Sequence, residues 1–391
     1  MRLLSLAGRY FNRALFYLVL LTPLSVSAED WIYSFSEGDN LWDFSIKHLH
    51  DVSYYEKLRK LNNIENPRQM EPGTKIRVPL EWIRSNAASA ELIAASGTVQ
   101  HLQVEAKDYA STEQGQELSL GDRIRTGDDS TASIRFADGS VITLHSNSEL
   151  RFDHLSAYGE TGMVDTRLYF QQGRMDTRVM PMKGAGSRYE IHTPSAISAV
   201  RGTEYRVAVF ADTDASNIEV LGGGVQVEAA GEQLLVPAGF GTQVEKGKPP
   251  SKARKLLDAP RINAVPDRVV DQQWIVSWEQ IEAAKQYRAE LSDNADFTTL
   301  IDAQLDASTE FPLPELPAGK YYLRVRGVDE IRMEGKAAVV EFTLATFGVV
   351  IPGSLQLVYP DDDEDVRTHI QYNSRIGPDA VTGIPVSALI L

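Results

Sequence analysis

The sequence predicts a multidomain, mainly β protein, and three observations support that prediction. Residues 29–80 have the order strand, helix, helix, strand, which indicates a small βααβ module. Residues 95–245 alternate apolar and polar residues between closely spaced turn signals, which is typical of an all-β domain. Residues 266–345 repeat this alternation and indicate a β-sandwich. The chain has 391 residues, 43% of them hydrophobic, enough for two or three separate cores.

The other segments have the composition of targeting or connecting sequence. Arginines at positions 2, 9 and 13 precede a short apolar run, and small residues end at Ala28, so residues 1–28 are predicted to be a cleaved signal peptide. An uncleaved N-terminal anchor is the alternative, but the run is short for a membrane span and Pro23 interrupts it. No later segment is apolar enough to span a bilayer. We expect linkers at 81–94 and 246–265, and a poorly ordered tail at 346–391 that includes the acidic run 361–365.

Charge and cysteine content limit the classes of partner. The net charge is −15 and the sequence pI is about 5.0, with no long Lys/Arg run, which argues against nucleic acid and anionic membrane surfaces as partners. The chain has no cysteine, so it can form no disulfide and carry no lipid-anchored cysteine. An exported protein without thiols suits an oxidising periplasm. These features favour a periplasmic location.

Capping signals place the helices of the first module. A predicted strand ends at Gly38, and Asp39 or Asn40 can cap the following helix by accepting a hydrogen bond from a free backbone N–H group. Ser53 with Glu56 has the spacing of a capping box for a second helix. A Pro-Gly turn then leads into a short strand at 75–78.

Three motifs in this module occur in the order typical of a known family. They are EGDNLWDFS, KLNNIENP and MEPGTKIRVP. Through them residues 31–79 resemble a LysM module, although Asn40 stands where that family usually has Thr or Ser. The resemblance implies binding of N-acetylglucosamine-containing glycans, chiefly peptidoglycan or chitin, in a groove between two loops. The implied glycan-binding residues are Gly38, Asp39, Asn40, Leu41, Asn63, Ile64, Met70, Glu71, Pro72 and Gly73.

The residue types in this groove fit a neutral sugar. Glycine and proline turns expose backbone groups to acetamido substituents, and Leu41, Ile64 and Met70 can offer apolar contacts. The alternative is that Gly38, Leu41 and Gly73 only build the fold. A single small module is expected to bind weakly, because it buries little surface.

The middle segment contains hairpins and one long motif. Ile134 and Phe136 alternate with polar residues, Asp138-Gly139 gives the turn, and residues 141–144 return. Gly173 is among the expected turn positions. The segments LSLGDRIRTGDDSTASIRFADGSVITLHSNSEL, LYFQQGRMDTRV and YEIHTPSAISAVRGTEYRV resemble the FecR domain over residues 95–245.

The FecR resemblance implies a type of domain. The family is named from a periplasmic ferric-citrate sensor that relays a signal to a sigma factor, and that protein has a cytoplasmic part and a membrane helix that this sequence does not show. Arg201 and Glu204 flank Gly202-Thr203 in the family motif and are candidates for contact with a partner. The alternative is an ion pair that pins a turn, which would contribute about 1 kcal/mol or less if exposed.

The third segment has the pattern of a sandwich. Trp274, Val276 and Trp278 share one predicted strand face, more consistent with core packing than with a sugar platform, while Arg324 and Arg326 are expected to point outward. Leu316-Pro317 before Tyr321 resembles the tyrosine corner of β-sandwiches. Residues 266–345 are therefore similar to a fibronectin type III-like module.

Catalytic motifs are not apparent in the sequence. It has no His-Glu-x-x-His, no Gly-x-Ser-x-Gly, and no cysteine nucleophile, so we expect no enzyme, no metal and no cofactor. Our main interpretation is a non-enzymatic periplasmic protein that binds peptidoglycan and presents its β domains to an unknown envelope protein. One alternative is a signal-relay protein that acts through its FecR domain on a membrane regulator. A wall-remodelling hydrolase with a carboxylate pair is the other alternative.

Overall fold

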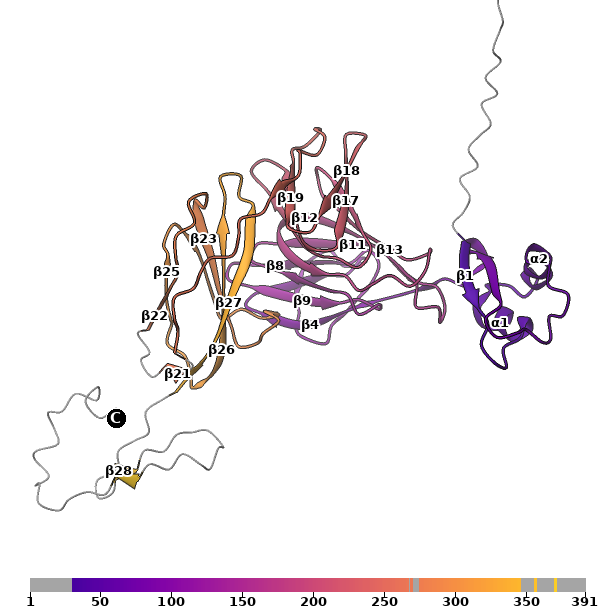
Figure 1. Ribbon diagram of the computed structural model, residues 1–391, viewed down its shortest axis with the longest axis horizontal. Coiled ribbons are helices and arrows are strands. Elements are labelled where there is room, and N and C mark those ends of the chain that lie inside the picture. Colours follow the sequence, from indigo (N-terminus) through magenta and orange to yellow (C-terminus); the bar gives the residue numbers. More distant parts are fainter. Residues whose placement is uncertain (1–29, 267, 270–273, 346–354, 357–368, 371–391) are drawn as a thin grey trace, which may run out of the picture.

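The computed structural model describes residues 30–266, 268–269, 274–345, 355–356 and 369–370. Three bodies follow one another along the chain and lie in a row (Figure 1). They are the first module (residues 30–82), the middle domain (residues 86–255) and the sandwich domain (residues 261–345). The predicted signal peptide and most of the predicted tail lie outside the described residues, which include only the short strands β28 (Leu355–Gln356) and β29 (His369–Ile370) of that tail.

The first module has the predicted order of elements. Strands β1 (Asp30–Ser34) and β2 (Lys75–Pro79) form an antiparallel pair around α1 (Leu41–His48) and α2 (Tyr54–Leu61), and the short 3-10 helix η1 (Leu80–Trp82) follows. Asn40 caps α1, because its Oδ1 accepts the N–H of Asp43 at 2.9 Å. The predicted capping box of α2 is wrong: Ser53 has a helical backbone and makes no capping hydrogen bond.

The middle domain is built from strands that close into a barrel-like pair of sheets. Its core is a single large cluster of buried apolar residues between the sheets. The strands are β3 (Asn86–Ala87), β4 (Ala90–Ser96), β5 (Val99–Leu102), β6 (Ala110–Ser111), β7 (Glu117–Leu118), β8 (Arg123–Thr126), β9 (Thr131–Arg135), β10 (Val141–Leu144), β11 (Glu149–Ala157), β12 (Val164–Arg178), β13 (Arg188–His192), β14 (Ile197–Val200), β15 (Glu204–Phe210), β16 (Ala215–Gly222), β17 (Gly224–Ala229), β18 (Glu232–Pro237), β19 (Phe240–Val244) and β20 (Arg254–Lys255).

Two segments expected as linkers contain strands of this domain. Within 81–94, β3 pairs with β11 and β4 begins its pairing with β9. Within 246–265, β20 pairs with β19. The second linker was expected because residues 245–255 are polar and contain proline. In both segments, pairing with neighbouring strands satisfies the backbone groups.

The long strand β12 joins the two sheets. Its first part pairs with β11 and β13, and from Gly173 onward it pairs with β15. Gly173 has φ +101°, and an added Cβ would lie 2.2 Å from Ser148 Oγ. The expected turn at Gly173 is therefore wrong, because the glycine lets an uninterrupted strand cross closely over residue 148 from one sheet to the other. The hairpin of β9 and β10 is confirmed, with Phe136 N–H donating to Ser140 O at 2.9 Å.

The sandwich domain has two sheets. Among the described residues, one has the order β21-β27-β26-β23-β24 and the other pairs β22 with β25. Trp278 is buried in the core between them and Trp274 packs against it, as the core-packing interpretation predicts. Tyr321 Oη donates to Pro317 O at 2.8 Å, the hydrogen bond of a tyrosine corner. The strands are β21 (Arg268–Val269), β22 (Ile275–Ser277), β23 (Gln286–Ser292), β24 (Asp302–Asp306), β25 (Glu310–Pro312), β26 (Gly319–Val328) and β27 (Glu334–Leu344).

Candidate functional site

The two loops of the predicted glycan groove lie against each other. Leu41 N–H donates to Pro67 O at 3.0 Å, and Gly73 N–H donates to Phe35 O at 2.8 Å. Gly38 and Gly73 have φ +87° and +86°, and neither would meet another atom within 4 Å if it carried a Cβ. The backbone of both turns is therefore accessible at the surface of the module.

The predicted groove residues divide into accessible and buried groups. Leu41, Ile64 and Met70 are core residues, with 0%, 9% and 8% of their surface exposed. The expectation that these three side chains offer apolar contacts to a glycan is therefore corrected: they pack beneath the loops. Asp39 and Asn40 are half-buried. The accessible members are Gly38, Asn63, Glu71, Pro72 and Gly73.

Asp39 is engaged within its own turn. Its carboxylate accepts the N–H of Ser36 at 2.7 Å and the hydroxyl of Tyr33 at 2.8 Å. These two hydrogen bonds lower the pKa of Asp39. Burial, together with the Asp39 carboxylate, raises the pKa of Tyr33 to about 12. Asp39 thus fixes the turn that precedes α1, which is a structural role.

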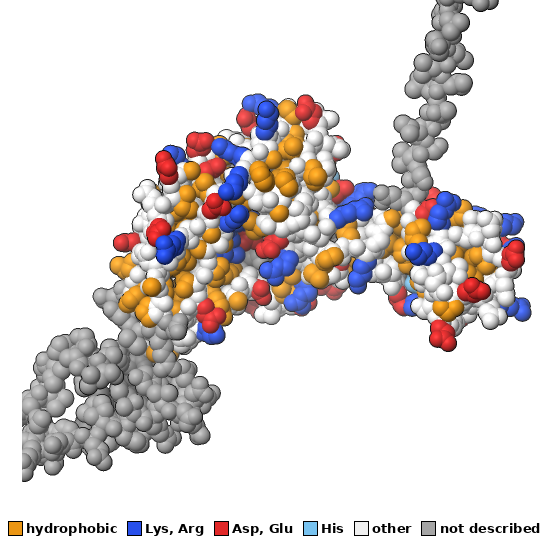
Figure 2. Space-filling model, in the orientation of Figure 1, with side chains coloured by type: hydrophobic (Ala, Val, Ile, Leu, Met, Phe, Trp, Pro, Cys, Tyr) orange, Lys and Arg blue, Asp and Glu red, His pale blue; other side chains and the backbone are white. Residues whose placement is uncertain are grey.

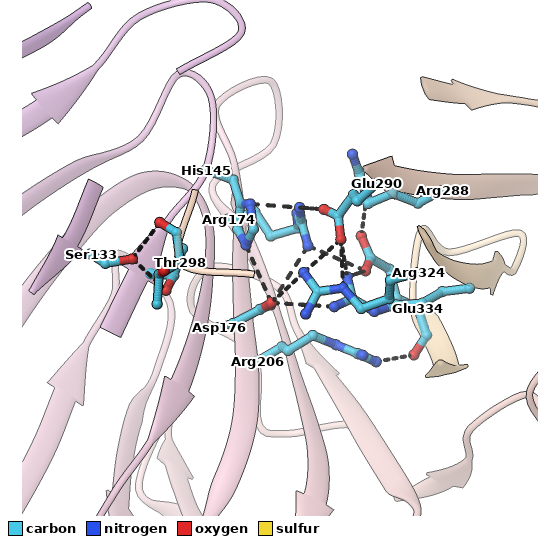
Figure 3. A network of polar contacts seen from close by, with 12 residues as sticks. Ser133, His145, Arg174, Asp176, Arg206, Arg288, Glu290, Thr298, Arg324 and Glu334 are labelled. Atoms are coloured by element: carbon cyan, nitrogen blue, oxygen red, sulfur yellow. Dashed lines mark hydrogen bonds and ion pairs between the residues drawn. The ribbon is translucent and has the colours of Figure 1, made fainter. Parts of the chain in front are cut away.

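A second candidate site lies where the middle domain meets the sandwich domain (Figure 3). Charged side chains from both domains form a buried cluster, which we call the interdomain network. The middle domain contributes His145, Arg174, Asp176, Arg206 and Glu219, and the sandwich domain contributes Arg288, Glu290, Arg324, Arg326 and Glu334.

Two glutamates of the sandwich domain organise the network. Glu290, on β23, forms ion pairs with Arg324 at 2.6 Å, with Arg326 at 3.2 Å and with Arg174 of the middle domain. Its side chain is only 1% exposed. Glu334, at the start of β27, pairs with Arg288 at 2.6 Å and with Arg326 at 2.9 Å. Each glutamate therefore compensates the positive charge of several arginines that are largely shielded from water.

Arg206 connects the domains through the backbone. It pairs with Glu219 at 2.6 Å inside the middle domain. Its Nη2 donates to the carbonyl oxygens of Glu334 and Gly335 at 2.7 and 2.8 Å. Glu219 Oε1 in turn accepts the N–H of Glu334 at 2.6 Å. These hydrogen bonds attach the start of β27 to strands β15 and β16.

Burial and neighbouring charges set the protonation states. Burial opposes ionisation of Glu290 and Glu334, but the surrounding guanidinium groups outweigh it and hold the pKa of each well below its usual range. Burial, with Glu334 nearby, raises the pKa of Glu219 to about 6. Burial and the charge of Arg174 lower the pKa of His145, so its imidazole is neutral at pH 7.

The sequence did not predict this network. It predicted that Arg324 and Arg326 point outward, and they do point away from the sandwich core, but the middle domain covers them and Arg326 is only 2% exposed. The available signal was the repeated charge at every second position of apolar strands, in Arg174 with Asp176 and in Arg324 with Arg326. One charged face on each of two domains predicts that these faces meet.

Arg201 and Glu204 line different cavities. Arg201 is exposed beside a hollow of about 730 Å³ on the outer face of strands β12, β13, β14 and β17. Glu204 lines a smaller cavity of about 240 Å³ at the interdomain seam. Between them Gly202 has φ +71°, and an added Cβ would lie 3.0 Å from Pro181 Cα. The glycine of this motif is therefore required by the fold.

The surface and the helices give further observations. On the face shown in Figure 2, Lys and Arg side chains are interspersed with acidic and apolar ones. Within the described ranges, no cluster of three or more His, Asp or Glu side chains is arranged to hold a metal ion. None of the helices in the described part of the chain is long and apolar enough to cross a membrane.

Comparison with protein families identifies part of the middle domain. Residues 122–226 match the family model described as FecR protein. This match lies inside the range 95–245 and confirms the FecR part of the predicted resemblance. It does not extend to the first module or to the sandwich domain. No curated protein sequence matches the chain.

Three solved structures that resemble the chain have low sequence identity and low TM-scores. Two crystal structures of "a putative anti-sigma factor from Parabacteroides distasonis ATCC 8503" have 15% and 16% sequence identity and TM-scores of 0.29 and 0.28, each covering 34% of this chain. The chain spans 59% of the length of those structures. The chicken CNTN1 FN1-FN3 domains have 8% identity and a TM-score of 0.20, covering 66% of this chain and 95% of that one. The chain thus contains a FecR domain within a mainly β, multidomain fold.

Proposed function

We propose that this chain is a non-catalytic regulatory protein of the cell envelope, located in the periplasm, whose FecR domain relays a signal to a membrane-bound partner. The match of residues 122–226 to the FecR family supports this most directly. It favours the signal-relay interpretation over the peptidoglycan tether, because the matched residues belong to the middle domain. The partner is an envelope protein of unknown identity.

The outer face of the middle domain, which contains the FecR match, offers a surface for that partner. Arg167, Glu190, Ala199, Gln226 and Leu235 lie opposite one another across five adjacent strands. These residues line the hollow of about 730 Å³, with Arg201 beside them. Leu235 is 64% exposed. A mixed charged and apolar surface of this kind is typical of non-obligate protein interfaces.

Site-specific cross-linking tests the proposal. A photoactivatable residue replaces Leu235 in the full chain expressed in its own cells, and a control chain carries it at Arg261, which is 81% exposed on the sandwich domain. We expect an adduct with an envelope membrane protein from position 235 and none from position 261. A Leu235→Asp variant should then abolish the transcriptional response to the partner's signal. Equal adducts from both positions, or none from either, would contradict the proposal.

A peptidoglycan tether is a second candidate function for the first module. It is supported by the predicted βααβ order and by the hydrogen bond from Leu41 N–H to Pro67 O, which brings the two loops together. Attachment to the wall would raise the local concentration of the FecR domain near its partner. Glycan contacts would come from exposed backbone at Gly38 and Gly73 and from Asn63, Glu71 and Pro72.

Sedimentation with purified sacculi tests this second function. A variant with Glu71→Ala and Pro72→Ala changes two exposed side chains of the loop, and Glu81→Ala is the matched control outside it. We expect the intact chain and the control to sediment, and the loop variant to remain mostly in solution. If all three sediment equally, or none does, the groove is not a glycan site. Soluble glycan released in the same samples would favour a hydrolase instead.

A further inference from the structure

The interdomain network lies beside a cavity of about 490 Å³ whose walls come from two domains. Arg174, Arg206 and Glu219 line it from the middle domain, and Arg288 and Glu334 line it from the sandwich domain. Small-molecule sites occur preferentially at domain interfaces, and this volume is within their usual range. Arg332 lies at the rim, 46% exposed and paired with Asp212, so the cavity has an accessible edge.

The charges that line this cavity do not balance. Among its described lining residues there are four arginines and three carboxylates. The arginines are Arg174, Arg206, Arg288 and Arg332, and the carboxylates are Asp212, Glu219 and Glu334. An uncompensated buried guanidinium is unfavourable unless an anion accompanies it. The excess positive charge therefore favours an anionic occupant.

Arg206 also has an unused donor. Its side chain is 2% exposed, and its Nη1 is buried without a hydrogen-bond partner in the described structure. The other two guanidinium nitrogens are engaged with Glu219 and with the backbone of β27. Buried donors are nearly always satisfied. The unused Nη1 can donate a charge-assisted hydrogen bond to one oxygen of a carboxylate or phosphate group.

We propose that the cavity between the middle domain and the sandwich domain binds a small anion bearing a carboxylate or phosphate group, held by Arg206 and Arg288. Such a ligand would contact both walls and balance the buried charge. Because it binds only the docked arrangement, it would stabilise the attachment of the two domains. This inference does not depend on the proposed regulatory function.

Calorimetric titration of the folded full chain tests the proposal, with inorganic phosphate and succinate as separate probes at constant ionic strength. We expect saturable 1:1 binding of at least one probe and a rise in melting temperature at saturation. Arg288→Gln should weaken binding at least tenfold. Arg178→Gln is the matched control, because Arg178 is 62% exposed and does not line this cavity. It should bind within twofold of the wild type.

A second variant tests the site without changing its charge. Ala303 and Leu305 lie on the same face of β24 and line the cavity, and Ala303 is exposed. Ala303→Trp should fill the space and abolish binding even if Arg288→Gln does not fold. Absence of saturable binding by either probe would overturn the proposal. So would wild-type affinity in Ala303→Trp, or an equal loss of affinity in Arg178→Gln and Arg288→Gln.

Discussion

The guanidinium of Arg326 lies 3.2 Å from the carboxylate of Asp176, although the two residues are 150 positions apart in the sequence. Asp176 belongs to β12 of the middle domain and Arg326 to β26 of the sandwich domain. Their contact, with those of Glu290 and Arg206, makes the boundary between the domains a buried polar interface. The middle domain and the sandwich domain are therefore expected to behave as one body.

The network should be sensitive to removal of a single charge. Glu290→Gln leaves the guanidinium groups of Arg174, Arg324 and Arg326 without their shared carboxylate. Breaking a buried pair in this way costs about 3–5 kcal/mol. Urea unfolding followed by circular dichroism measures the loss. Arg261→Gln removes one partner of an exposed pair with Glu279 and should change the free energy of unfolding by less than about 1 kcal/mol. Equal losses of unfolding free energy in the two variants would contradict a stabilising role for the interdomain network.

Acid should weaken the same interface. The pKa values of Asp176, Glu290 and Glu334 are lowered in the folded protein. Their stabilisation is therefore fully present above the ordinary carboxyl range near pH 4, and is lost as pH falls through the lowered values. We expect the urea midpoint to fall steeply below about pH 4 in the wild type and less steeply in Glu290→Gln. Parallel pH profiles for the two proteins would argue against ionised glutamate at this site.

Glu219 should give the opposite pH dependence of stability. Its pKa is raised to about 6 in the folded protein. As the pH rises, this carboxyl therefore loses its proton at a lower pH in the unfolded chain than in the folded protein. The folded state therefore loses stability between the ordinary carboxyl range and about pH 6. Glu219→Gln should remove this part of the pH dependence, measured by thermal unfolding from pH 4 to 7. An unchanged slope in the variant would show that Glu219 is not the group responsible.

Substitution of Gly173 should destabilise the fold, because of its close approach to Ser148 as well as its positive φ. An alanine Cβ would approach Ser148 Oγ to 2.2 Å and Ser148 Cα to 2.5 Å. Gly231→Ala is the matched control, because Gly231 also has a positive φ, +78°, but has open space around it. We expect Gly173→Ala to lose at least about 2 kcal/mol more unfolding free energy than the control. Equal losses would indicate that backbone strain alone matters.

The cap of α1 should contribute only to the first module. Asn40→Ala removes the acceptor for the N–H of Asp43 and should cost about 1 kcal/mol. Hydrogen exchange in residues 41–48 should become faster, while exchange in β12 stays unchanged. Faster exchange throughout the chain would mean that the module and the middle domain unfold together.

Residues close together in the sequence were sufficient to predict local structure. Asn40 was one of two predicted caps, and the Tyr321 corner follows from a short motif, because each depends on hydrogen bonds between residues close in the chain. The failures involve distant neighbours. Leu41 was assigned to a binding surface, yet it is fully buried, because a motif does not show whether its residue faces solvent or core. Arg324 and Arg326 were expected to point outward, because the alternation within β26 shows that they face away from the sandwich core but does not show which domain covers them.

Native-state hydrogen exchange under increasing urea most directly tests whether the middle domain and the sandwich domain form one body. Amides in β12 and β26 should share one opening free energy in the wild type, since the network must break before either strand opens alone. In Glu290→Gln the β26 amides should open at a lower free energy than those of β12. If β26 already opens independently of β12 in the wild type, the two domains are separate units and the interdomain account is contradicted.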